Sequence, residues 1–301
     1  MALAQEAKPT SAGGFEVLRE RAMQGDAAAQ TGLAYLYEQG QGVPRDYAEA
    51  FRWYLKAAEK GDAIAQFNVG LLYFNGRGTK QDKTSGIIWI RKAAEQGPPR
   101  AQTLAAATYA TSGDYAKALD LYRKAAENGD DQAQETLGFI YTSGPYAEWR
   151  KVVPTDLSLG VAWLRRAVES DNSNAEYSLA SLYKDGRGVI QDYKEAVRLY
   201  QMAAEQGHSD SQYSLGTMYL NGQGVTANPI IAYMWCNIAA AQTDAARIFP
   251  VEMAIKGREL AEETMRVFKV ADGVEQAQEL SRIWKPRDRR TSGAISPGDK
   301  R

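Results

Sequence analysis

The sequence predicts an all-α fold, a right-handed α-solenoid in which antiparallel helix pairs stack one on the next. The main basis is a repeat: a small residue followed by Gln or Glu recurs at steps of 36, 36, 32, 42 and 36 residues, beginning at Ala29. A tyrosine stands eight residues after each small residue, and four of the six units carry a two-glycine turn such as Gly40-Gln41-Gly42. Because one short helix pair cannot bury its own apolar stripe, these units must stack.

The first helix of each unit, termed helix A, is indicated by apolar or small residues at offsets 0, 4, 5 and 8, counted from the small residue that precedes the Gln or Glu. In the first unit these are Ala29, Leu33, Ala34 and Tyr37. This spacing places all four side chains on one face of a helix with 3.6 residues per turn. The small residues that define offset 0 are Ala29, Ala65, Ala101, Ala133, Ala175 and Ser211.

A second helix, termed helix B, follows in each unit and begins after a residue whose side chain can cap a helix N-terminus. These cap residues are Asp46, Asp82, Asp114, Asp156, Asp192 and Asn228. Four residues later comes a small residue and seven residues later a large apolar one, a pattern that lets two helices approach closely. A glycine such as Gly61 then ends helix B in four units, and Asp171 stands at that place in the fourth.

The repeat register divides the chain into a flexible N-terminal segment, a capping helix, six repeats, C-terminal capping helices and a disordered basic tail. The third unit lacks the long turn between its helices, whereas the fourth carries an expanded loop from residue 143 to residue 155. The expected boundaries are 1–14, 15–25, the repeats 26–61, 62–97, 98–129, 130–171, 172–207 and 208–243, then 244–284 and 285–301.

Composition excludes several classes of function. The 301 residues carry 36 Lys and Arg against 37 Asp and Glu, a net charge of −1, which argues against a nucleic-acid partner. No apolar run approaches the roughly 18 residues of a membrane-spanning helix. With one cysteine, Cys236, and one histidine, His208, the chain can form neither an internal disulfide nor a thiolate zinc site, so we expect no metal and no cofactor.

The repeated motif is Ala-x-x-x-Leu-Gly-x-x-Tyr, then Gly-x-Gly-Val, Asp-Tyr-x-x-Ala, a Trp-Tyr-x-x-Ala-Ala run and a closing glycine. This motif resembles the Sel-one-like repeat family, a relative of the tetratricopeptide repeat, over about residues 26–243. The resemblance implies a non-enzymatic adaptor that assembles or regulates protein complexes, in bacterial envelopes or in eukaryotic quality control. Some bacterial relatives carry a disulfide in each repeat and are linked to cell-wall ligands; this chain departs from them in having only Cys236.

His208 and Cys236 invite a catalytic interpretation, which the register argues against. His208 stands in the turn before helix A, where other repeats carry residues such as Asp62, so we expect a helix cap. Cys236 occupies the helix B position held by Tyr54 in the first repeat and is expected to be a buried, inert thiol.

Helix A should line the concave groove of the solenoid, and its residues outside the packing stripe should face a ligand. The groove is mixed apolar and amide in character, which suits a peptide or an extended protein segment. The candidate ligand-binding residues are Tyr35, Phe67, Leu71, Phe74, Asn75, Phe139, Tyr177, Lys184, Tyr213 and Asn221. The alternative for Phe67 and Phe139 is packing between adjacent repeats. The expanded loop supplies a second candidate surface, Tyr146, Trp149 and Arg150, unless Trp149 folds back onto its own repeat.

The sequence therefore predicts an interaction scaffold that binds a protein or peptide partner, with no nucleic acid and no transmembrane segment. The alternative is an envelope-associated binder or enzyme that acts on cell-wall fragments. Ala2-Leu3-Ala4 has the form of a signal-peptidase site. A signal peptide removed before Gln5 would place the protein in a periplasm or outside the cell; the alternative is a cytoplasmic protein. The partner's identity and the oligomeric state are not indicated.

Overall fold

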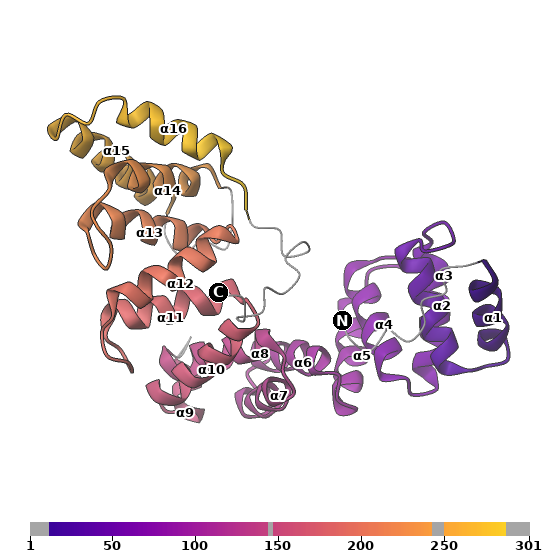
Figure 1. The fold of residues 1–301 in the computed structure, drawn as a ribbon. Helices are drawn as coiled ribbons and strands as arrows, with labels where there is room; N and C mark the ends of the chain where they lie inside the picture. The colour runs from indigo at the N-terminus through magenta and orange to yellow at the C-terminus, as the bar shows by residue number, and fades with distance from the viewer. Residues whose placement is uncertain (1–11, 144–146, 243–249, 287–301) are drawn as a thin grey trace, which may run out of the picture. The chain divides into compact units, whose positions relative to one another are not determined.

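A computed structural model of the protein describes residues 12–143, 147–242 and 250–286. Within those ranges the chain forms sixteen α-helices and no strand, which confirms the predicted all-α class. The chain divides into two compact units, residues 1–134 and 135–301, and in each unit antiparallel helix pairs stack on their neighbours (Figure 1).

Each repeat contributes one A helix and one B helix. The A helices are α2 (Ala27–Gln39), α4 (Ala63–Asn75), α6 (Pro99–Thr111), α8 (Asp131–Thr142), α11 (Ser173–Asp185) and α13 (Ser209–Asn221). The B helices are α3 (Tyr47–Glu59), α5 (Lys83–Glu95), α7 (Tyr115–Glu127), α10 (Leu157–Glu169), α12 (Tyr193–Glu205) and α14 (Pro229–Ala241). The caps are those that the sequence indicates: Asp46, for example, accepts hydrogen bonds from the N–H groups of Ala48 and Glu49.

Glycine allows the two helices of a pair to touch. A Cβ atom built at Gly70 of α4 would lie 2.6 Å from Cγ1 of Ile90 and 2.9 Å from the carbonyl oxygen of Gly86, both on α5. The second glycine of the turn has a separate role, since Gly78 has φ +71° and a Cβ there would overlap the carbonyl of Tyr47 in the preceding repeat. The two-glycine turn therefore packs against the preceding repeat.

The Gln of the repeated dipeptide joins each helix A to the element before it. Gln66 is fully buried, and its Nε2 donates to the carbonyl oxygen of Ala58, near the end of α3, at 3.1 Å. The same bond links Gln30 to Ala22, Gln134 to Ala126 and Gln212 to Ala204, at 3.0 to 3.1 Å. Each bond gives a second donor to a carbonyl at a helix C-terminus, which also accepts from the N–H of the glycine three residues later, as Ala58 does from Gly61.

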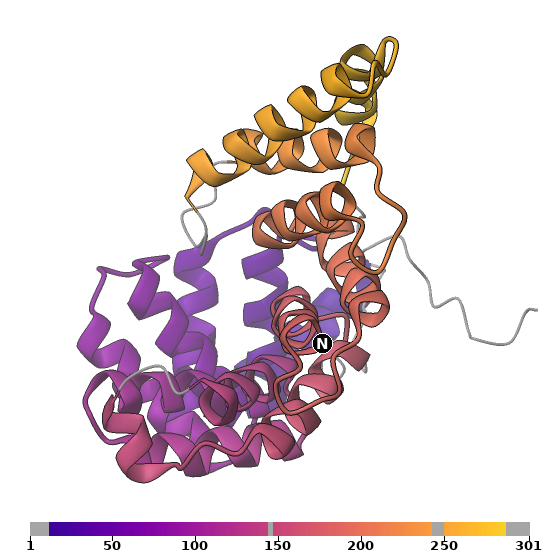
Figure 2. The same ribbon diagram turned by 90° about the vertical axis from the view of Figure 1, so that its left-hand side faces the viewer.

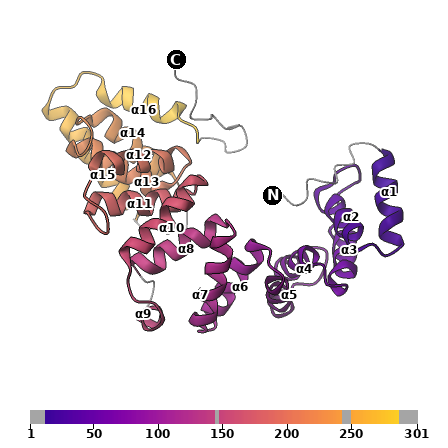
Figure 3. The same ribbon diagram turned by 60° about the horizontal axis from the view of Figure 1, so that its bottom comes forward.

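Helices outside the repeats cover the two ends of the chain. In the first unit α1 (Ala12–Met23) lies beside α2, and Phe15 and Leu18 pack on Leu33 (Figure 3). In the second unit α15 (Val251–Val267) and α16 (Gly273–Ile283) both pack against α14, as the orange and yellow helices of Figure 2 show. None of the helices that the structure describes has the length and apolar character needed to cross a bilayer.

Candidate functional site

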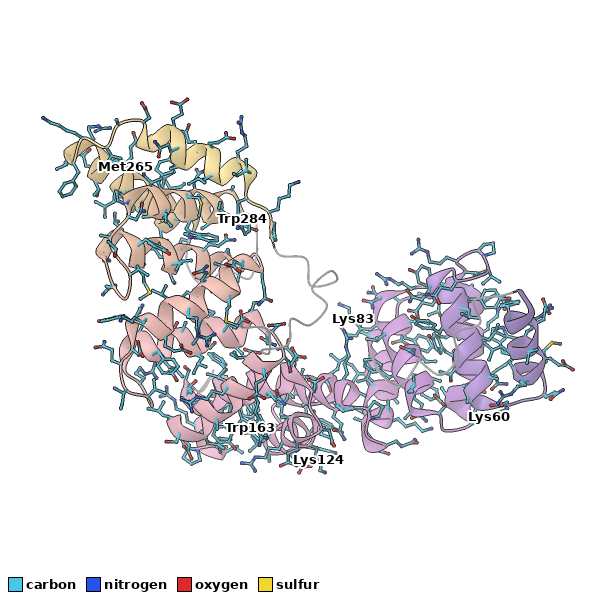
Figure 4. All side chains as sticks on the ribbon, viewed as in Figure 1. Lys60, Lys83, Lys124, Trp163, Met265 and Trp284 are labelled. Atoms are coloured by element: carbon cyan, nitrogen blue, oxygen red, sulfur yellow. The ribbon has the colours of Figure 1, made fainter. Side chains whose placement is uncertain are left out.

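The helix A surface of the first unit exposes two aromatic side chains. Tyr35 of α2 is 37% exposed and Phe74 of α4 is 38% exposed, and Asn75 beside Phe74 is also exposed. The Lys83 ammonium lies 5.5 Å from the centroid of the Phe74 ring, and Figure 4 labels Lys83 at the beginning of α5. A cation over an exposed ring contributes only about 0.5–1 kcal/mol, so a ligand can displace it.

Phe67 and Leu71, also predicted to face a ligand, contribute mainly to packing. Both are partly buried against a cluster formed by Ile90, Ala94 and Ala105. That cluster joins repeats two and three. Phe67 therefore packs between adjacent repeats, which is the alternative that the sequence left open. Ligand contact by either side chain stays a prediction.

A buried hydroxyl lies next to the exposed Tyr35. Tyr54 of α3 is fully buried, and its hydroxyl donates to the Glu38 carboxylate at 2.9 Å. Burial, reinforced by the Glu38 carboxylate, raises the pKa of Tyr54 above its ordinary value, so the phenol is neutral at physiological pH. The groove prediction did not include Tyr54, because its position on helix B gives no indication that its hydroxyl reaches a helix A carboxylate.

In the second unit the predicted residues separate into exposed and packed groups. Phe139 of α8 is 42% exposed, and Asn221 at the end of α13 is exposed. Lys184 is half-buried, with its ammonium 3.9 Å from the Asp185 carboxylate. Phe139 and Asn221 are therefore available to a ligand.

Tyr177 is half-buried because it packs against the next repeat. Its ring stacks on His208 at 5.0 Å between centroids and lies 5.7 Å from the ring of Tyr200, whose hydroxyl is 2.9 Å from Oγ of Ser181. Burial, with a further contribution from the Asp210 carboxylate, raises the pKa of Tyr177 to about 12. The repeat register alone did not indicate that these polar groups meet.

Tyr213 and Cys236 are overlaid by α15. A Cβ at Gly257 of α15 would lie 3.4 Å from the Tyr213 ring and 2.9 Å from Sγ of Cys236. Burial raises the pKa of the Cys236 thiol to about 12, which keeps it protonated and unsuited to nucleophilic attack. Tyr213 is thus half-buried under an element that the repeat pattern does not include.

The expanded loop does not present its tryptophan. Trp149 lies on the short helix α9 (Ala147–Val152) and is 4% exposed, so its predicted role in an exposed loop surface is not supported, and the alternative of packing into the fold holds. Arg150 is exposed, and Nη2 donates to the carbonyl of Ser143 at 3.4 Å. Tyr146 lies outside the described residues.

His208 is the N-cap of α13, as the register predicts. Its Nδ1 accepts from the backbone N–H of Ser211 at 3.2 Å and lies 3.0 Å from the Ser211 hydroxyl. Within the described residues no three His, Cys, Asp or Glu side chains are grouped so that they could hold a metal ion. Among the predicted helix A residues, those that the structure leaves exposed are aromatic and carboxamide side chains: Tyr35, Phe74, Asn75, Phe139 and Asn221.

Comparison with protein families matches the Sel1 repeat six times, at residues 27–62, 63–98, 107–130, 133–172, 173–208 and 209–244. The third match begins late, in the unit whose turn is short. A curated relative, the rat DAP3-binding cell death enhancer 1, is 32% identical over 85 residues, which are 28% of this chain and 15% of that protein.

Two solved structures show the same architecture. A Sel1 repeat protein from Oxalobacter formigenes is 32% identical, with a TM-score of 0.66, and the match covers 75% of this chain and 92% of that one. A protective antigen of uropathogenic Escherichia coli, described as displaying an SLR fold, is 26% identical with a TM-score of 0.57, covering 95% of this chain and 69% of that one.

Proposed function

The chain belongs to the Sel1 repeat family, and from that premise we propose that it is a non-enzymatic scaffold that binds an extended protein segment along its helix A surfaces. Proteins built from Sel1 repeats generally act as scaffolds for protein–protein interaction. Within each unit taken by itself, such a segment is held by aromatic anchors, Tyr35 and Phe74 in the first unit and Phe139 in the second.

The observation that carries this proposal is the exposure of Tyr35 and Phe74. Both rings are more than a third exposed on the A helices of neighbouring repeats, although the small and aliphatic stripe residues of the same helices are almost fully buried: Ala29, Leu33, Ala34, Ala65 and Val69. Exposed aromatic side chains that the core does not need are the residue type that most often dominates binding energy at interfaces.

Carboxamides beside the rings suit an extended backbone. Asn75 and Asn221 are exposed at the ends of α4 and α13, and each carboxamide can both donate to and accept from a peptide group. The net charge of −1 gives no preference for a strongly charged partner. The proposed segment is therefore one that alternates apolar side chains with an accessible backbone.

The test uses a displayed library of random 12-residue peptides selected on the full chain, followed by fluorescence anisotropy with one selected peptide. Tyr35→Ala and Phe74→Ala should each weaken binding by about 1–3 kcal/mol, because an anchor loses its ring, while helicity by circular dichroism stays constant. The control is Ile88→Ala, which removes a more exposed apolar side chain from the B helix α5.

Three results would contradict the proposal. If Ile88→Ala weakens binding as much as Phe74→Ala, the peptide is not held on the helix A surface. If Phe74→Ala leaves affinity unchanged and lowers the melting temperature, Phe74 serves the fold and the anchor assignment is wrong. A retained affinity with both Tyr35→Ala and Phe74→Ala would remove the first unit from the binding surface.

A further inference from the structure

The two-glycine turns of the two units differ in charge. In the first unit each turn, taken with the first helix B residue that follows it, spans 40–47 or 76–83, and the two stretches together carry four cations and two carboxylates, a net charge of +2. The equivalent stretches of the second unit, 186–193 and 222–229, carry no net charge. The four cations are all exposed and are termed the basic edge: Arg45, Arg77, Lys80 and Lys83.

Packing between the turns brings two arginines of the basic edge to one aromatic ring. The turn of repeat two lies on the beginning of α3, where a Cβ at Gly78 would overlap the Tyr47 carbonyl. The guanidinium carbons of Arg45 and Arg77 lie 5.9 and 5.7 Å from the centroid of the Tyr47 ring. Two like charges beside one ring repel each other, so an anion that contacts both of them is favoured.

The carboxylates nearest in sequence do not pair with these arginines. Asp46 accepts from the N–H groups of Ala48 and Glu49, and Asp82 accepts from the N–H and the hydroxyl of Ser85, so both cap their helices. In the part of the chain that the structure describes, the Arg45 and Arg77 side chains form no ion pair and no hydrogen bond.

The matching arginine of the second unit is used differently. Arg187 stands in repeat five where Arg77 stands in repeat two, and its Nη2 donates to the Thr142 carbonyl of repeat four at 3.1 Å. At the place of Tyr47, repeat four carries Leu157, which offers no ring to a cation. Arg187 therefore joins two repeats, whereas the N–H donors of Arg77 remain available to a partner.

We propose that the basic edge binds an acidic segment of a partner protein, whose Asp or Glu carboxylates pair with Arg45 and Arg77 and, further along the segment, with Lys80 or Lys83. Carboxylates fit this surface because a guanidinium can donate two parallel hydrogen bonds to one carboxylate. The cation–π contacts at exposed sites are weak, so the arginines can turn toward the segment without disturbing the fold. This binding goes beyond the aromatic anchors of helix A and does not depend on them.

The test measures fluorescence anisotropy of fluorescein-labelled octaglutamate titrated with the full chain at about 50 mM salt, where charge pairing is weakly screened. Octaglutamate should bind, and labelled octaglutamine, which has the same backbone without charge, should not. Arg45→Glu combined with Arg77→Glu should weaken octaglutamate binding by about tenfold, because two attractive contacts become repulsive. Circular dichroism should show unchanged helicity.

The matched control is Lys56→Glu combined with Lys92→Glu. These exposed lysines lie 4.3 and 5.1 Å from the ring centroids of Trp53 and Trp89 on the B helices of the same two repeats, so the control makes the same change in charge and also removes two cation–π contacts. It should leave octaglutamate binding unchanged. Equal weakening by the two double variants, or no weakening by the arginine variant, would overturn the proposal.

A second readout locates the bound probe directly. Carbodiimide joins a carboxylate to a neighbouring lysine amine through an amide bond, and mass spectrometry of the digested product identifies that lysine. Octaglutamate should be joined to Lys80 or Lys83 at least several times more often than to Lys56 or Lys92. An even distribution over these four lysines would overturn the proposal. Since octaglutamate has no apolar side chain, its binding tests the basic edge alone, and the selected peptide tests the aromatic anchors.

Discussion

Substituting Gly70 by alanine tests whether the close contact between helices A and B sets stability. The new Cβ would lie 2.6 Å from Cγ1 of Ile90, 2.9 Å from the carbonyl oxygen of Gly86 and 3.1 Å from the backbone nitrogen of Ile90. Two of these three atoms are backbone, so relief requires α4 and α5 to separate. Alanine gains about 1 kcal/mol of helix propensity, and overpacking of a rigid contact costs about 3 kcal/mol. The expected net loss is about 2 kcal/mol.

Gly32→Ala is the matched control, because Gly32 also lies within an A helix. Its Cβ would meet only the side chain of Leu18, at 3.4 Å and beyond, an ordinary contact with a flexible group. The helix propensity gain should then dominate, so the free energy of unfolding should rise by about 0.5–1 kcal/mol. The two substitutions have the same chemistry and opposite predicted signs.

Urea unfolding followed by circular dichroism and by tryptophan fluorescence measures both variants. For a unit of this size the Gly70→Ala loss corresponds to a fall in melting temperature of roughly 5–10 °C. A Gly70→Ala protein as stable as the unsubstituted chain would show that α4 and α5 can move apart without cost. The reasoning would also fail if Gly32→Ala and Gly70→Ala changed stability in the same direction by similar amounts.

Three further outcomes follow from the structure. Gln66→Leu should cost about 1 kcal/mol in urea unfolding, because the Ala58 carbonyl loses one of its two donors and keeps only the Gly61 N–H. No loss would mean that the Gln66 bond contributes nothing. Cys236 should resist Ellman's reagent at pH 8 and react at the rate of local opening, and immediate labelling of the folded chain would contradict its burial. The pKa of Tyr54 is raised on folding, so its contribution to stability is complete below about pH 10 and declines at higher pH. In Tyr54→Phe the urea midpoint should therefore fall less steeply with pH above about pH 10. An unchanged slope would refute this.

The repeat units were predictable because local physics determines them. Each helix B begins at a residue with a capping side chain, and small residues such as Gly70 recur where the helices of a pair touch. The Gln of the dipeptide was visible as a pattern, but its bond to the preceding unit was not, because offset 1 falls on neither the packing stripe nor the exposed face. The sequence likewise explained the second glycine of each turn only by its positive φ. The structure adds a second reason at Gly78, because a Cβ there would overlap the backbone of Tyr47.

Side-chain exposure along helix A was predictable only in part, because register gives a direction and not what lies in that direction. Tyr177 and Tyr213 share one register position with Phe67, and the three meet different neighbours: the His208 and Tyr200 rings, the α15 helix, and the Ile90 cluster. Of these neighbours, only α15 does not belong to a repeat. Since it overlies Tyr213, the surface that repeat six offers a partner is reduced to the region of Asn221. Binding by Tyr213 would require α15 to move away from Tyr213 and Cys236. A partner of the second unit should therefore depend on Phe139 more than on either tyrosine.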